Sequence, residues 1–406
     1  MTFCCRACQS TRLAPVLSLG KTPLANALLQ ADQLAQPEAW YPLELVFCPN
    51  CTLVQITETV PPEILFRDYV YFSSFADTAL QNARSIVERL ISSRHLGAGS
   101  LAVEIASNDG YLLQFYHQAG IPVLGIEPAR NIARVAETER GVRTIPEFFD
   151  EPLARRLRAQ GERADVLHGN NVLAHVADLN GVVAGISLLL KEDGVAVIEV
   201  PYVKDLIDRV EFDTIYHEHL CYFSATALAR LFASHQLTLQ DVERLPIHGG
   251  SLRLFVGHAP RQSAAASQLL TEEAAWGVDQ FAFYQGFGAR VENLKVRLRS
   301  LLRDLKAEGK RIAAYGASAK GATLLNYFGI GQETLDFVVD RSPVKQGKYT
   351  PGTHLPIYAP EKLVIDQPDY ALLLTWNFAD EILAQQAAYL QGGGHFIIPV
   401  PEPRVV

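Results

Sequence analysis

The sequence predicts an α/β protein with two separate doubly wound parallel sheets, preceded by a small module that carries paired cysteines. Short apolar runs alternate with helical patterns over residues 101–200 and again over residues 310–399, which is typical of parallel sheets covered by helices. Two C-x-x-C pairs stand within residues 5–51. With 406 residues the chain is too long for one ordinary core, so two or three domains are expected.

Composition and charge limit the partners of the chain. Hydrophobic residues make up 49% and charged residues 20%, which is typical of a folded protein. No apolar run approaches the ~18 residues of a membrane span, and no basic region followed by an apolar run opens the chain. We therefore expect a cytoplasmic protein without membrane contact. The net charge of −8 argues against a nucleic-acid partner and favours a small molecule.

The first module carries the pairs Cys5-x-x-Cys8 and Cys48-x-x-Cys51, with Cys4 as a spare beside the first pair. Each pair presents two thiolates from one tight turn, and two such turns form the tetrahedral four-sulfur site that zinc prefers. Four sulfur ligands leave no open position, so a structural zinc is expected. Disulfides are the weaker alternative in the cytosol. The first 60 residues carry few basic side chains, which argues against a DNA-binding ribbon.

An aromatic segment, residues 66–74, joins this module to a helix expected at about 78–93. Tyr69 and Tyr71 project the same way if the segment is extended. Their phenols can reach into a polar site, or they can pack as half-buried residues.

The central unit begins with the apolar run 101–105, which ends in a polar turn and leads through a helical pattern to a second run, 123–126, closed by Glu127. This is a strand–helix–strand unit with parallel strands. Small ligands bind where such a loop leaves a central strand, and an acid that ends the next strand can accept hydrogen bonds from ribose hydroxyls. Glu127 fits that role.

The polar turn itself lacks the G-x-G-x-x-G pattern that holds a pyrophosphate. It carries Glu104 and Asp109 instead, which repel phosphate and suit a cationic ligand such as S-adenosylmethionine. An ordinary solvated turn is the alternative.

The alternation of strands and helices continues beyond Glu127. Asp165 and Asn170 bracket the fourth strand, where a methyl-donor site needs a polar rim, although a capping Asn is the simpler explanation for Asn170. The expected elements are helix 132–140, strand 144–145, helix 153–159, strand 164–169, a helix from 182, a turn at 191–194 and strand 195–200, stopped by Pro201.

The stretch from Tyr216 to His219 provides two imidazoles, a carboxylate and a phenol within four residues. Such a set suits proton abstraction, because a carboxylate can orient a His and a Tyr can donate to developing negative charge. A metal site is disfavoured because the H-E-x-x-H spacing is missing. A solvated polar loop is the remaining alternative.

From about residue 237 the pattern changes. His248-Gly249-Gly250 interrupts a strand-like passage, and two glycines imply a close approach of the backbone to other backbone or to a ligand. A long helix is expected over about 269–308.

The last part repeats the α/β pattern, with strands expected at 311–315, 337–340, 370–375 and 395–399. The turn 316–321 after the first of these strands is small, opens a helix and carries one charge, Lys320. It suits an anion, most simply a diphosphate. Lys345 and Lys348 add cations on the following loop. A tight turn with an exposed Lys is the alternative.

Together these pieces resemble the nucleotide-sugar C-methyltransferases of deoxysugar pathways, which add a branching methyl group to a 4-keto-6-deoxyhexose. The resemblance covers nearly the whole chain and rests on several motifs in one order. They are the two cysteine pairs, Glu104-x-x-x-Asn108-Asp109-Gly110, Asn171-x-x-x-His175, Tyr216-x-Glu218-His219, Pro246-x-His248-Gly249-Gly250 and Tyr315-Gly316-Ala-x-Ala-Lys320.

The resemblance implies four parts: a zinc-binding module (1–75), an S-adenosylmethionine-binding class I methyltransferase domain (76–236), connecting strands and a long helix (237–309), and a C-terminal Rossmann-like domain for the sugar nucleotide (310–406). It also implies methylation at C3 of the sugar through an enolate. The diphosphate carrier is expected to be dTDP, with GDP as the alternative, and the oligomeric state stays open.

The resemblance also implies roles for single residues. His219 is the expected base, with Tyr216 and Glu218 beside it, and with His175, Asn171 and either Tyr69 or Tyr71 facing the same cavity. Expected donor-site residues are Glu104, Ala106, Asn108, Asp109, Glu127, Phe148, Asn170 and Asn171. Expected sugar-nucleotide residues are His248, Ser318, Lys320, Asp340 and Lys345. Ala106 departs from the family, which has Gly there, and its methyl group leaves less room for the donor's carboxyl end.

Three other functions fit parts of the sequence. One is an O- or N-methyltransferase on a nucleotide sugar. Another is an NAD-dependent sugar oxidoreductase, which Glu127 suits and the missing glycine fingerprint disfavours. A third is a zinc-ribbon adaptor without catalysis, which the Tyr216–His219 chemistry disfavours.

Overall fold

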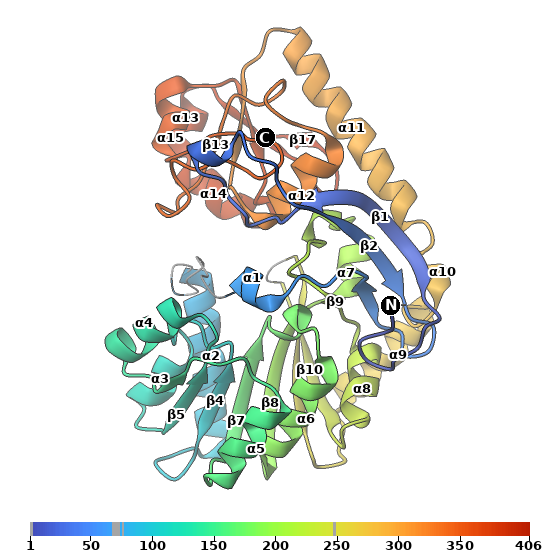
Figure 1. Cartoon of the computed structure of the whole chain (residues 1–406), viewed down its shortest axis with the longest axis vertical. Coiled ribbons are helices and arrows are strands. Elements are labelled where there is room, and N and C mark those ends of the chain that lie inside the picture. The colour runs from blue at the N-terminus through green and yellow to red at the C-terminus, as the bar shows by residue number, and fades with distance from the viewer. Residues whose placement is uncertain (1–2, 67–73, 75–76, 247–248) are drawn as a thin grey trace.

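The computed structural model describes residues 3–66, 74, 77–246 and 249–406. It contains three sheets, and two of them are doubly wound and mostly parallel, as the sequence predicts. In Figure 1 the two parallel-sheet domains lie at opposite ends of the molecule, and the strands of the N-terminal module run along one side between them. Within the described residues, none of the helices has the length and apolarity that crossing a membrane requires.

The N-terminal module is built on a four-stranded antiparallel sheet in the order β1-β2-β3-β9. Its strands are β1 (Ala14–Pro23), β2 (Trp40–Phe47), β3 (Val54–Ile56) and β9 (Cys221–Tyr222). The last strand comes from far along the chain, and Val54 pairs with Tyr222. The module is therefore fixed to the central domain by a sheet edge as well as by side chains.

The central sheet has seven strands in the order β10-β11-β8-β7-β4-β5-β6. Its strands are β4 (Ala102–Ile105), β5 (Val123–Ile126), β6 (Thr144–Ile145), β7 (Ala164–Asn170), β8 (Leu190–Pro201), β10 (Thr238–Leu245) and β11 (Ser251–Gly257). The first five are parallel, and β11 inserts antiparallel between β8 and β10. The chain order reverses between β4 and β7, so ligands are expected at the carboxyl ends of these two strands.

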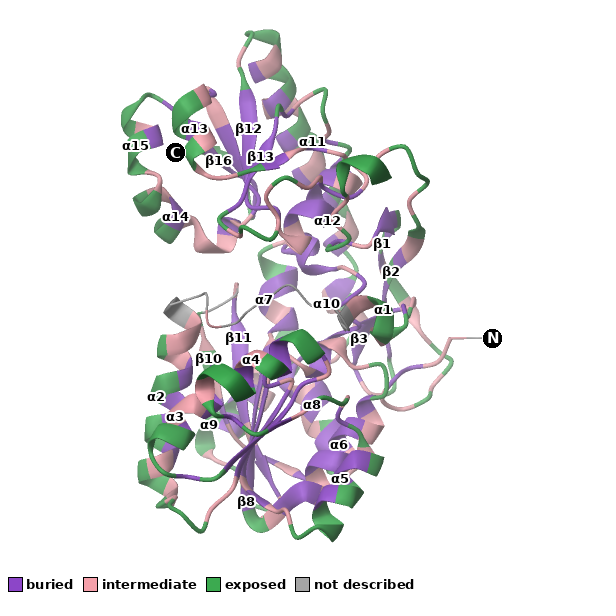
Figure 2. Cartoon of the chain, turned by 60° about the vertical axis from the view of Figure 1, so that its left-hand side comes forward, coloured by how far each residue is buried: buried purple, intermediate pink, exposed green. Residues whose placement is uncertain are grey.

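Helices cover both faces of this sheet. In Figure 2, α2 and α3 lie on one side of the strands, and α5 and α6 lie on the other. The helices of this part are α1 (Pro62–Phe66), α2 (Asp77–Arg94), α3 (Leu113–Gln118), α4 (Arg130–Arg140), α5 (Glu151–Ala159), α6 (Leu179–Leu189), α7 (Val203–Asp208) and α8 (Ala225–Ala233). The strands are buried and the outer helix faces are exposed, as the hydrophobic pattern predicts.

Three details differ from the sequence prediction. Strands β10 and β11 complete the central sheet, so this sheet extends past the boundary expected at residue 236. The long helix is broken into α9 (Ala264–Trp276), α10 (Phe281–Tyr284) and α11 (Phe287–Ala307), because Gly277 ends the first at a φ of +74°. The expected turn at 191–194 is an irregularity within β8.

The C-terminal domain has a six-stranded sheet in the order β14-β13-β12-β15-β16-β17. Its strands are β12 (Ile312–Tyr315), β13 (Val338–Val339), β14 (Ile357–Tyr358), β15 (Tyr370–Leu373), β16 (His395–Ile398) and β17 (Arg404–Val405). Its helices are α12 (Ala319–Phe328), α13 (Glu361–Asp366), α14 (Ala379–Gln385) and α15 (Ala387–Gln391). The chain order again reverses beside the first strand, between β12 and β15.

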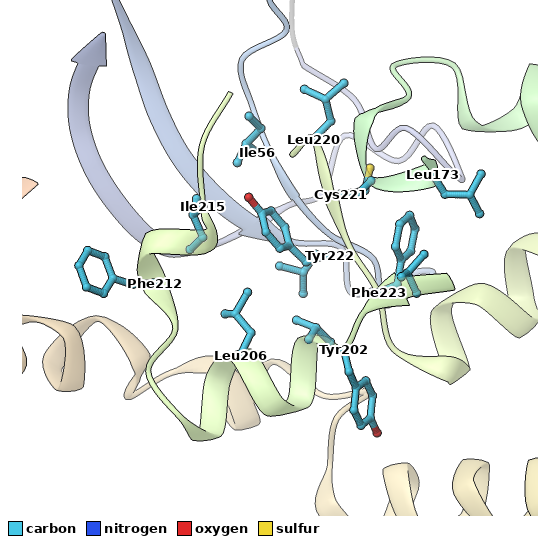
Figure 3. Packing of buried hydrophobic residues seen from close by; sticks show 14 of the residues in the cluster. Ile56, Leu173, Tyr202, Leu206, Phe212, Ile215, Leu220, Cys221, Tyr222 and Phe223 are labelled. Atoms are coloured by element: carbon cyan, nitrogen blue, oxygen red, sulfur yellow. The ribbon is translucent and has the colours of Figure 1, made fainter. Parts of the chain in front are cut away.

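A segment at residues 211–220 contacts the N-terminal module, the central domain and the C-terminal domain. Buried apolar residues within it and on both sides of it anchor the segment, and Figure 3 shows how they pack. They include Leu206, Phe212, Ile215, Leu220, Tyr222 and Phe223. The polar residues of the segment are therefore held on a rigid support.

Candidate active site

The four cysteines of the two pairs form one cluster in the N-terminal module. Sγ of Cys5 lies 3.4 Å from Sγ of Cys51, Sγ of Cys8 lies 3.5 Å from Sγ of Cys48, and all four sulfurs lie within 4.8 Å of one another. Four sulfurs bound to one zinc ion at about 2.3 Å are roughly 3.8 Å apart. The cluster therefore fits a structural zinc, and it uses Cys5 rather than Cys4.

The turn after β4 is shaped by backbone conformations that side chains rarely adopt. Ala106, Asn108 and Gly110 have φ values of +52°, +50° and +75°. Asn and Gly tolerate this region, whereas Ala costs about 1 kcal/mol there. The turn is thus held at the expense of strain at Ala106.

Glu127, at the end of β5, holds this turn in place. Its Oε2 accepts a hydrogen bond from the Asn108 N–H at 2.9 Å, and its Oε1 accepts one from the Ala129 N–H at 2.8 Å. Burial raises the pKa of Glu127, and the two backbone donors partly offset that effect. Each oxygen keeps a second lone pair, so ribose hydroxyls can still bind.

Acidic side chains gather at the carboxyl end of β4. Asp109 Oδ2 accepts a hydrogen bond from Ser74 Oγ at 2.5 Å and pairs with Arg140 at 3.2 Å. Glu104 is buried, and desolvation together with the charges of Asp109 and Glu127 raises its pKa well above the ordinary value. A bound cation would lower that pKa again, so the site suits a positively charged ligand.

Three acceptors in this region have no hydrogen-bond partner among the described residues: Glu104 Oε2, Asp109 Oδ1 and Asn170 Oδ1. Buried acceptors without partners are costly unless a ligand or water supplies the donors. The ammonium group and ribose hydroxyls of S-adenosylmethionine are such donors. The residues therefore fit this methyl donor.

Two asparagines follow one another where β7 ends, beside the same turn: Asn170 is the last residue of the strand and Asn171 comes after it. Asn170 Nδ2 donates to the Tyr111 hydroxyl at 3.2 Å. Asn171 has a φ of +54° and donates its N–H to the Glu199 carbonyl at 2.8 Å. Phe148, which was expected at the donor site, is half-buried three residues beyond β6.

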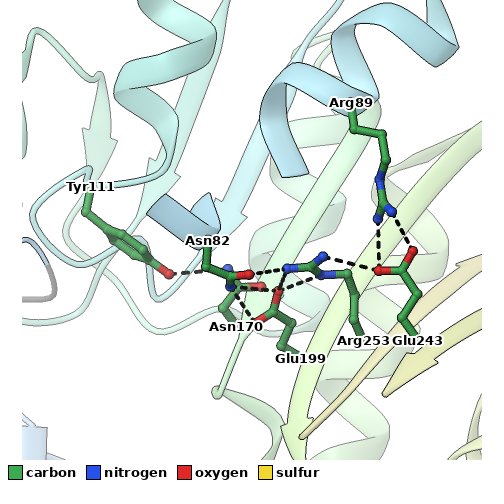
Figure 4. Close-up of polar contacts among 7 residues, drawn as sticks. All are labelled: Asn82, Arg89, Tyr111, Asn170, Glu199, Glu243 and Arg253. Carbon is green, nitrogen blue, oxygen red and sulfur yellow. Dashed lines mark hydrogen bonds and ion pairs between the residues drawn. The ribbon is translucent and has the colours of Figure 1, made fainter. Parts of the chain in front are cut away.

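A buried ion pair supports the neighbouring strand ends, as Figure 4 shows. Arg253 on β11 donates Nε to Glu199 Oε1 at 2.7 Å, and Asn82 on α2 bridges both side chains. Glu243 and Arg89 extend the network toward the surface. The network was not visible in the sequence, because the bonds from Arg253 to Glu199 and to Asn82 join residues 54 and 171 positions apart.

The segment at 211–220 carries the candidate base. His219 Nδ1 lies 3.0 Å from the Thr214 carbonyl oxygen, which can only accept, so in the neutral ring Nδ1 carries the hydrogen. His219 Nε2 lies 2.8 Å from the Tyr216 hydroxyl, which then donates to it. The structure thus holds one tautomer of His219, with the basic lone pair on Nε2.

Glu218 and His217 have different partners in the N-terminal module. Glu218 is 5% exposed, and its Oε1 accepts a hydrogen bond from Asn26 Nδ2 at 2.7 Å. Burial raises the pKa of Glu218 to about 7, although the Asn26 amide lowers it. His217 instead donates Nε2 to the Pro42 carbonyl of the N-terminal module at 3.0 Å. Only one of the two imidazoles of this stretch therefore faces the candidate site.

His175 joins the group from the turn after β7. Its ring lies edge-on to that of His219, with centroids 4.8 Å apart. Burial lowers the pKa of His175 to about 4, and a hydrogen bond with the backbone of Glu218 opposes that effect. The neutral imidazole is a hydrogen-bonding group here rather than a charge.

The turn after β12 is held by an acidic residue in the same way as the turn after β4. Asp340, at the end of β13, accepts the N–H of Ala317 at 2.9 Å and that of Ser342 at 2.8 Å. Ser318 caps α12 by accepting the Gly321 N–H at 3.1 Å, and Lys345 Nζ donates to the Ala317 carbonyl at 2.9 Å. These expected sugar-nucleotide residues thus shape the turn.

Lys320 lies at the contact between the C-terminal domain and the segment at 211–220. Its Nζ is 4.6 Å from the ring centroid of Trp376 and has no hydrogen-bond acceptor among the described residues. Trp376 Nε1 donates to Asp213 Oδ2 at 2.7 Å. Burial raises the pKa of Asp213 to about 6 and that of Glu211 to about 8, and the Lys320 charge lowers both.

Three expected site residues, Tyr69, Tyr71 and His248, lie outside the described residues. Two residues that sequence reasoning missed, Asn26 and Trp376, reach the segment at 211–220 from other domains. Neither stands in a motif with a chemical signature, so only the folded chain reveals them.

Comparison with known families covers most of the chain. Residues 5–66 match a model described as "Putative zinc binding domain", residues 77–242 match a methyltransferase domain, and residues 246–401 match a C-methyltransferase C-terminal domain. These three matches follow the N-terminal module, the central sheet and the C-terminal part of the structure.

One curated relative matches the chain over almost its whole length. C-methyltransferase NovU of Streptomyces niveus is 39% identical over 405 residues, which cover 99% of this chain and 96% of NovU. Among solved structures, magnesium protoporphyrin IX methyltransferase (ChlM) of Synechocystis with bound SAM is 13% identical, with a TM-score of 0.35 over 44% of this chain and 79% of that one. An S-adenosylmethionine-dependent methyltransferase of Clostridium acetobutylicum is 11% identical, with a TM-score of 0.36 over 45% and 92%. The structural likenesses are too low to carry any functional argument, whereas the match to NovU spans both whole chains. The chain therefore belongs to the family of S-adenosylmethionine-dependent C-methyltransferases with an N-terminal zinc-binding domain.

Proposed function

We propose that the protein transfers a methyl group to C3 of a 4-keto-6-deoxyhexose carried on a nucleoside diphosphate, with dTDP as the favoured carrier. The observation that carries the proposal is the chain Thr214–His219–Tyr216. In the neutral form of His219 it places the lone pair on Nε2, beside a phenol that can donate a hydrogen bond. Carbon methylation needs these two groups, because a carbon becomes nucleophilic only after it loses a proton.

In the proposed reaction His219 Nε2 takes the proton from the carbon next to the ketone. The electron pair of the broken C–H bond moves toward the carbonyl oxygen, which becomes an enolate. The Tyr216 hydroxyl, released from Nε2 when the sugar enters, donates to that oxygen. The ring of His175, 4.8 Å from His219, offers a second neutral imidazole for hydrogen bonding.

When bound, S-adenosylmethionine supplies an electrophilic methyl group on its sulfonium. Glu104, Asp109 and Asn170 offer the acceptors that fix its cationic and hydroxyl groups, while Glu127 keeps the turn in shape. The enolate carbon forms the new C–C bond as the S–C bond breaks, and the ketone is restored. Holding both reactants in one geometry removes much of the entropic barrier.

The C-terminal domain is proposed to hold the sugar nucleotide. The turn at 316–321 opens α12, whose ten residues present backbone N–H groups at their N-terminus. Lys345 adds a cation beside this turn, and its ammonium is 3.3 Å from Asp340. Lys320 packs against Trp376, so it is proposed to add positive charge to the region rather than to contact the diphosphate directly.

The test is incubation of a dTDP-4-keto-6-deoxyhexose with the protein and S-adenosylmethionine, followed by mass spectrometry and proton NMR. A gain of one methylene with loss of the C3 proton signal is expected. In D2O without the methyl donor, the C3 proton should exchange with solvent, which O- or N-methylation does not require. Absence of product from dTDP and GDP sugars, despite measured binding of the donor, would refute the proposed acceptor.

A pair of variants tests the base. His219→Gln is expected to lower turnover by about 10²–10⁴-fold and to abolish C3 exchange, while donor affinity stays close to wild type. His217→Gln is the matched control, because His217 belongs to the same segment and donates to Pro42. Near-normal turnover of the His219 variant would overturn the assignment.

A further inference from the structure

An arm of the N-terminal module, residues 24–39, connects strands β1 and β2 and reaches the C-terminal domain. Leu29 and Tyr349 exchange two backbone hydrogen bonds of 2.9 Å. Glu38 accepts hydrogen bonds from the Gly352 N–H at 3.0 Å and from His354 Nε2 at 2.6 Å. The arm is therefore fixed at both ends, to its own sheet and to another domain.

Asn26 lies on this arm and contacts the proposed active site. Its Nδ2 is 2.7 Å from Glu218 Oε1, across 192 residues of sequence. In the described part of the chain this is the one hydrogen bond to the Glu218 carboxylate. Glu218 is buried whereas Asn26 is exposed, so the amide covers the carboxylate from the solvent side.

We propose that Asn26 is a positioning residue for methyl transfer: its amide holds the Glu218 carboxylate in its ionised form and in a fixed orientation on the segment that also carries Tyr216 and His219. The inference rests on the proposed function, because that function gives the segment at 211–220 its catalytic role. The zinc-binding module then supplies one functional group to the active site, in addition to its structural role.

The geometry supports this role in two ways. A hydrogen bond from an amide N–H to a carboxylate stabilises the ionised form of the acid and fixes its rotamer. The backbone of Glu218 also bonds His175, whose ring meets that of His219, so a displaced Glu218 disturbs both imidazoles. The arm is held at both ends, which keeps the amide in position.

Within the part of the chain that the structure describes, the nearby titratable groups come from three places. Tyr216 and His219 stand on the same segment, His175 approaches from the turn after β7, and His217 faces the N-terminal module. Burial raises the pKa of Glu218 to about 7, and the Asn26 amide is the group that lowers it. Removal of the amide is therefore expected to raise this pKa further.

A second asparagine provides a matched control. Asn180 on α6 donates Nδ2 to the carbonyl oxygens of Arg6 and Ala7, both at 3.0 Å. It ties the first cysteine turn to the central domain without touching Glu218. Asn180→Ala thus loosens the zinc-binding module and leaves the carboxylate contact in place.

The experiment compares Asn26→Ala, Asn26→Asp and Asn180→Ala in the full chain. Methylation rates are measured from pH 6 to pH 9, with zinc content and donor affinity as folding controls. For Asn26→Ala we expect a roughly tenfold loss at pH 7 that is largely recovered at pH 9, since a higher pH restores ionised Glu218. Asn26→Asp places two carboxyls at this spacing, which share a proton, so a larger loss is expected. Asn180→Ala should keep the shape of the wild-type profile.

A second readout needs no substrate. Carbon-13 NMR of the Glu218 carboxyl should show titration at higher pH in Asn26→Ala than in the wild type and in Asn180→Ala. If the wild type makes no methylated sugar, the proposed function fails while this titration still tests the contact. Unchanged titration in Asn26→Ala, or a pH profile that matches that of Asn180→Ala, overturns the inference.

Discussion

Asp340 does in the C-terminal domain what Glu127 does in the central one. Each acid ends the second strand of its sheet, accepts a backbone N–H from the turn after the first strand at 2.9 Å, and accepts the N–H two residues beyond itself at 2.8 Å. The first strand is β4 in one case and β12 in the other. Both turns lie at the carboxyl edge of a parallel sheet, beside the point where strand order reverses.

This equivalence predicts that each acid stabilises its own turn independently. Asp340→Asn should weaken the hydrogen bonds to Ala317 and Ser342 by roughly 1–3 kcal/mol, since charged acceptors form the stronger bonds. Hydrogen exchange at those two amides should accelerate, with no change at Asn108 and Ala129. Glu127→Gln should give the reverse pattern. Exchange that changes in both domains for either variant would contradict independent bracing.

The two acids should also affect the binding of different ligands. Asp340→Asn is expected to reduce affinity for the nucleotide sugar and to leave S-adenosylmethionine affinity unchanged, whereas Glu127→Gln should do the opposite. Isothermal titration of each ligand measures both constants on the same samples.

Replacement of Ala106 by Gly is predicted to strengthen binding of the methyl donor. Its φ of +52° costs about 1 kcal/mol for an alanine, and Gly removes that cost. Ala106→Gly is therefore expected to bind S-adenosylmethionine more tightly by up to roughly fivefold, because the turn no longer stores strain and the missing methyl group admits the donor. Ala106→Val, with a bulkier branched side chain, should weaken donor binding. Equal affinities in all three proteins would show that the turn relaxes freely.

Buried acids near Lys320 predict a pH-dependent stability. The pKa of Glu211 is raised to about 8 and that of Asp213 to about 6, mainly by burial. Between the ordinary pKa and the raised one, the folded chain keeps a proton that the unfolded chain has released. For these two groups, stability is therefore greatest at low pH and falls as the pH rises toward about 8.

Glu211→Gln removes the larger part of this effect. At pH 8 we expect the variant to melt at a higher temperature than the wild type, with a free energy of unfolding larger by on the order of 1 kcal/mol or more. At pH 5 the two melting temperatures should be close. Glu402→Gln is the control, since that side chain is 70% exposed. Calorimetry at both pH values gives the comparison, and a wild-type melting temperature that rises between pH 5 and pH 8 in step with the Glu211 variant would contradict the prediction.

The sequence was most informative where function depends on local periodicity. Strand ends can be read from apolar runs, so Glu127 and Asn170 are predicted at the carboxyl edge of the central sheet, where they lie. Glu104, which the sequence assigns to the turn, lies inside β4. The segment at 216–219 could be recognised by composition, but composition cannot tell His217 from His219. Only the tertiary contacts with Pro42 and Thr214 give the two imidazoles different partners.

Contacts between distant segments account for what the sequence could not show. Asn26 reaches Glu218 because an arm crosses from one domain to another, and Trp376 reaches Asp213 across 163 residues. The long helix was overestimated for a different reason: helical periodicity persists across Gly277, whose left-handed conformation ends the helix.

Metal content provides the last prediction. The sulfur cluster includes Cys5, Cys8, Cys48 and Cys51, and Gln55 Nε2 donates to Cys5 Sγ at 3.2 Å. Such a donor orients the ligand and stabilises its thiolate. Cys5→Ser should therefore lose most of its zinc and melt at a clearly lower temperature, because a structural zinc contributes directly to the stability of its module.

Cys4→Ser is the matched control, one residue away, and should retain one zinc ion per chain with an unchanged melting temperature. Metal analysis by plasma mass spectrometry, together with thermal unfolding, distinguishes the two variants. Because the arm that carries Asn26 belongs to this module, the Cys5 variant should also lose methylation activity while its central domain still binds the donor. Loss of zinc from the Cys4 variant, with retention in the Cys5 variant, would reassign the first ligand.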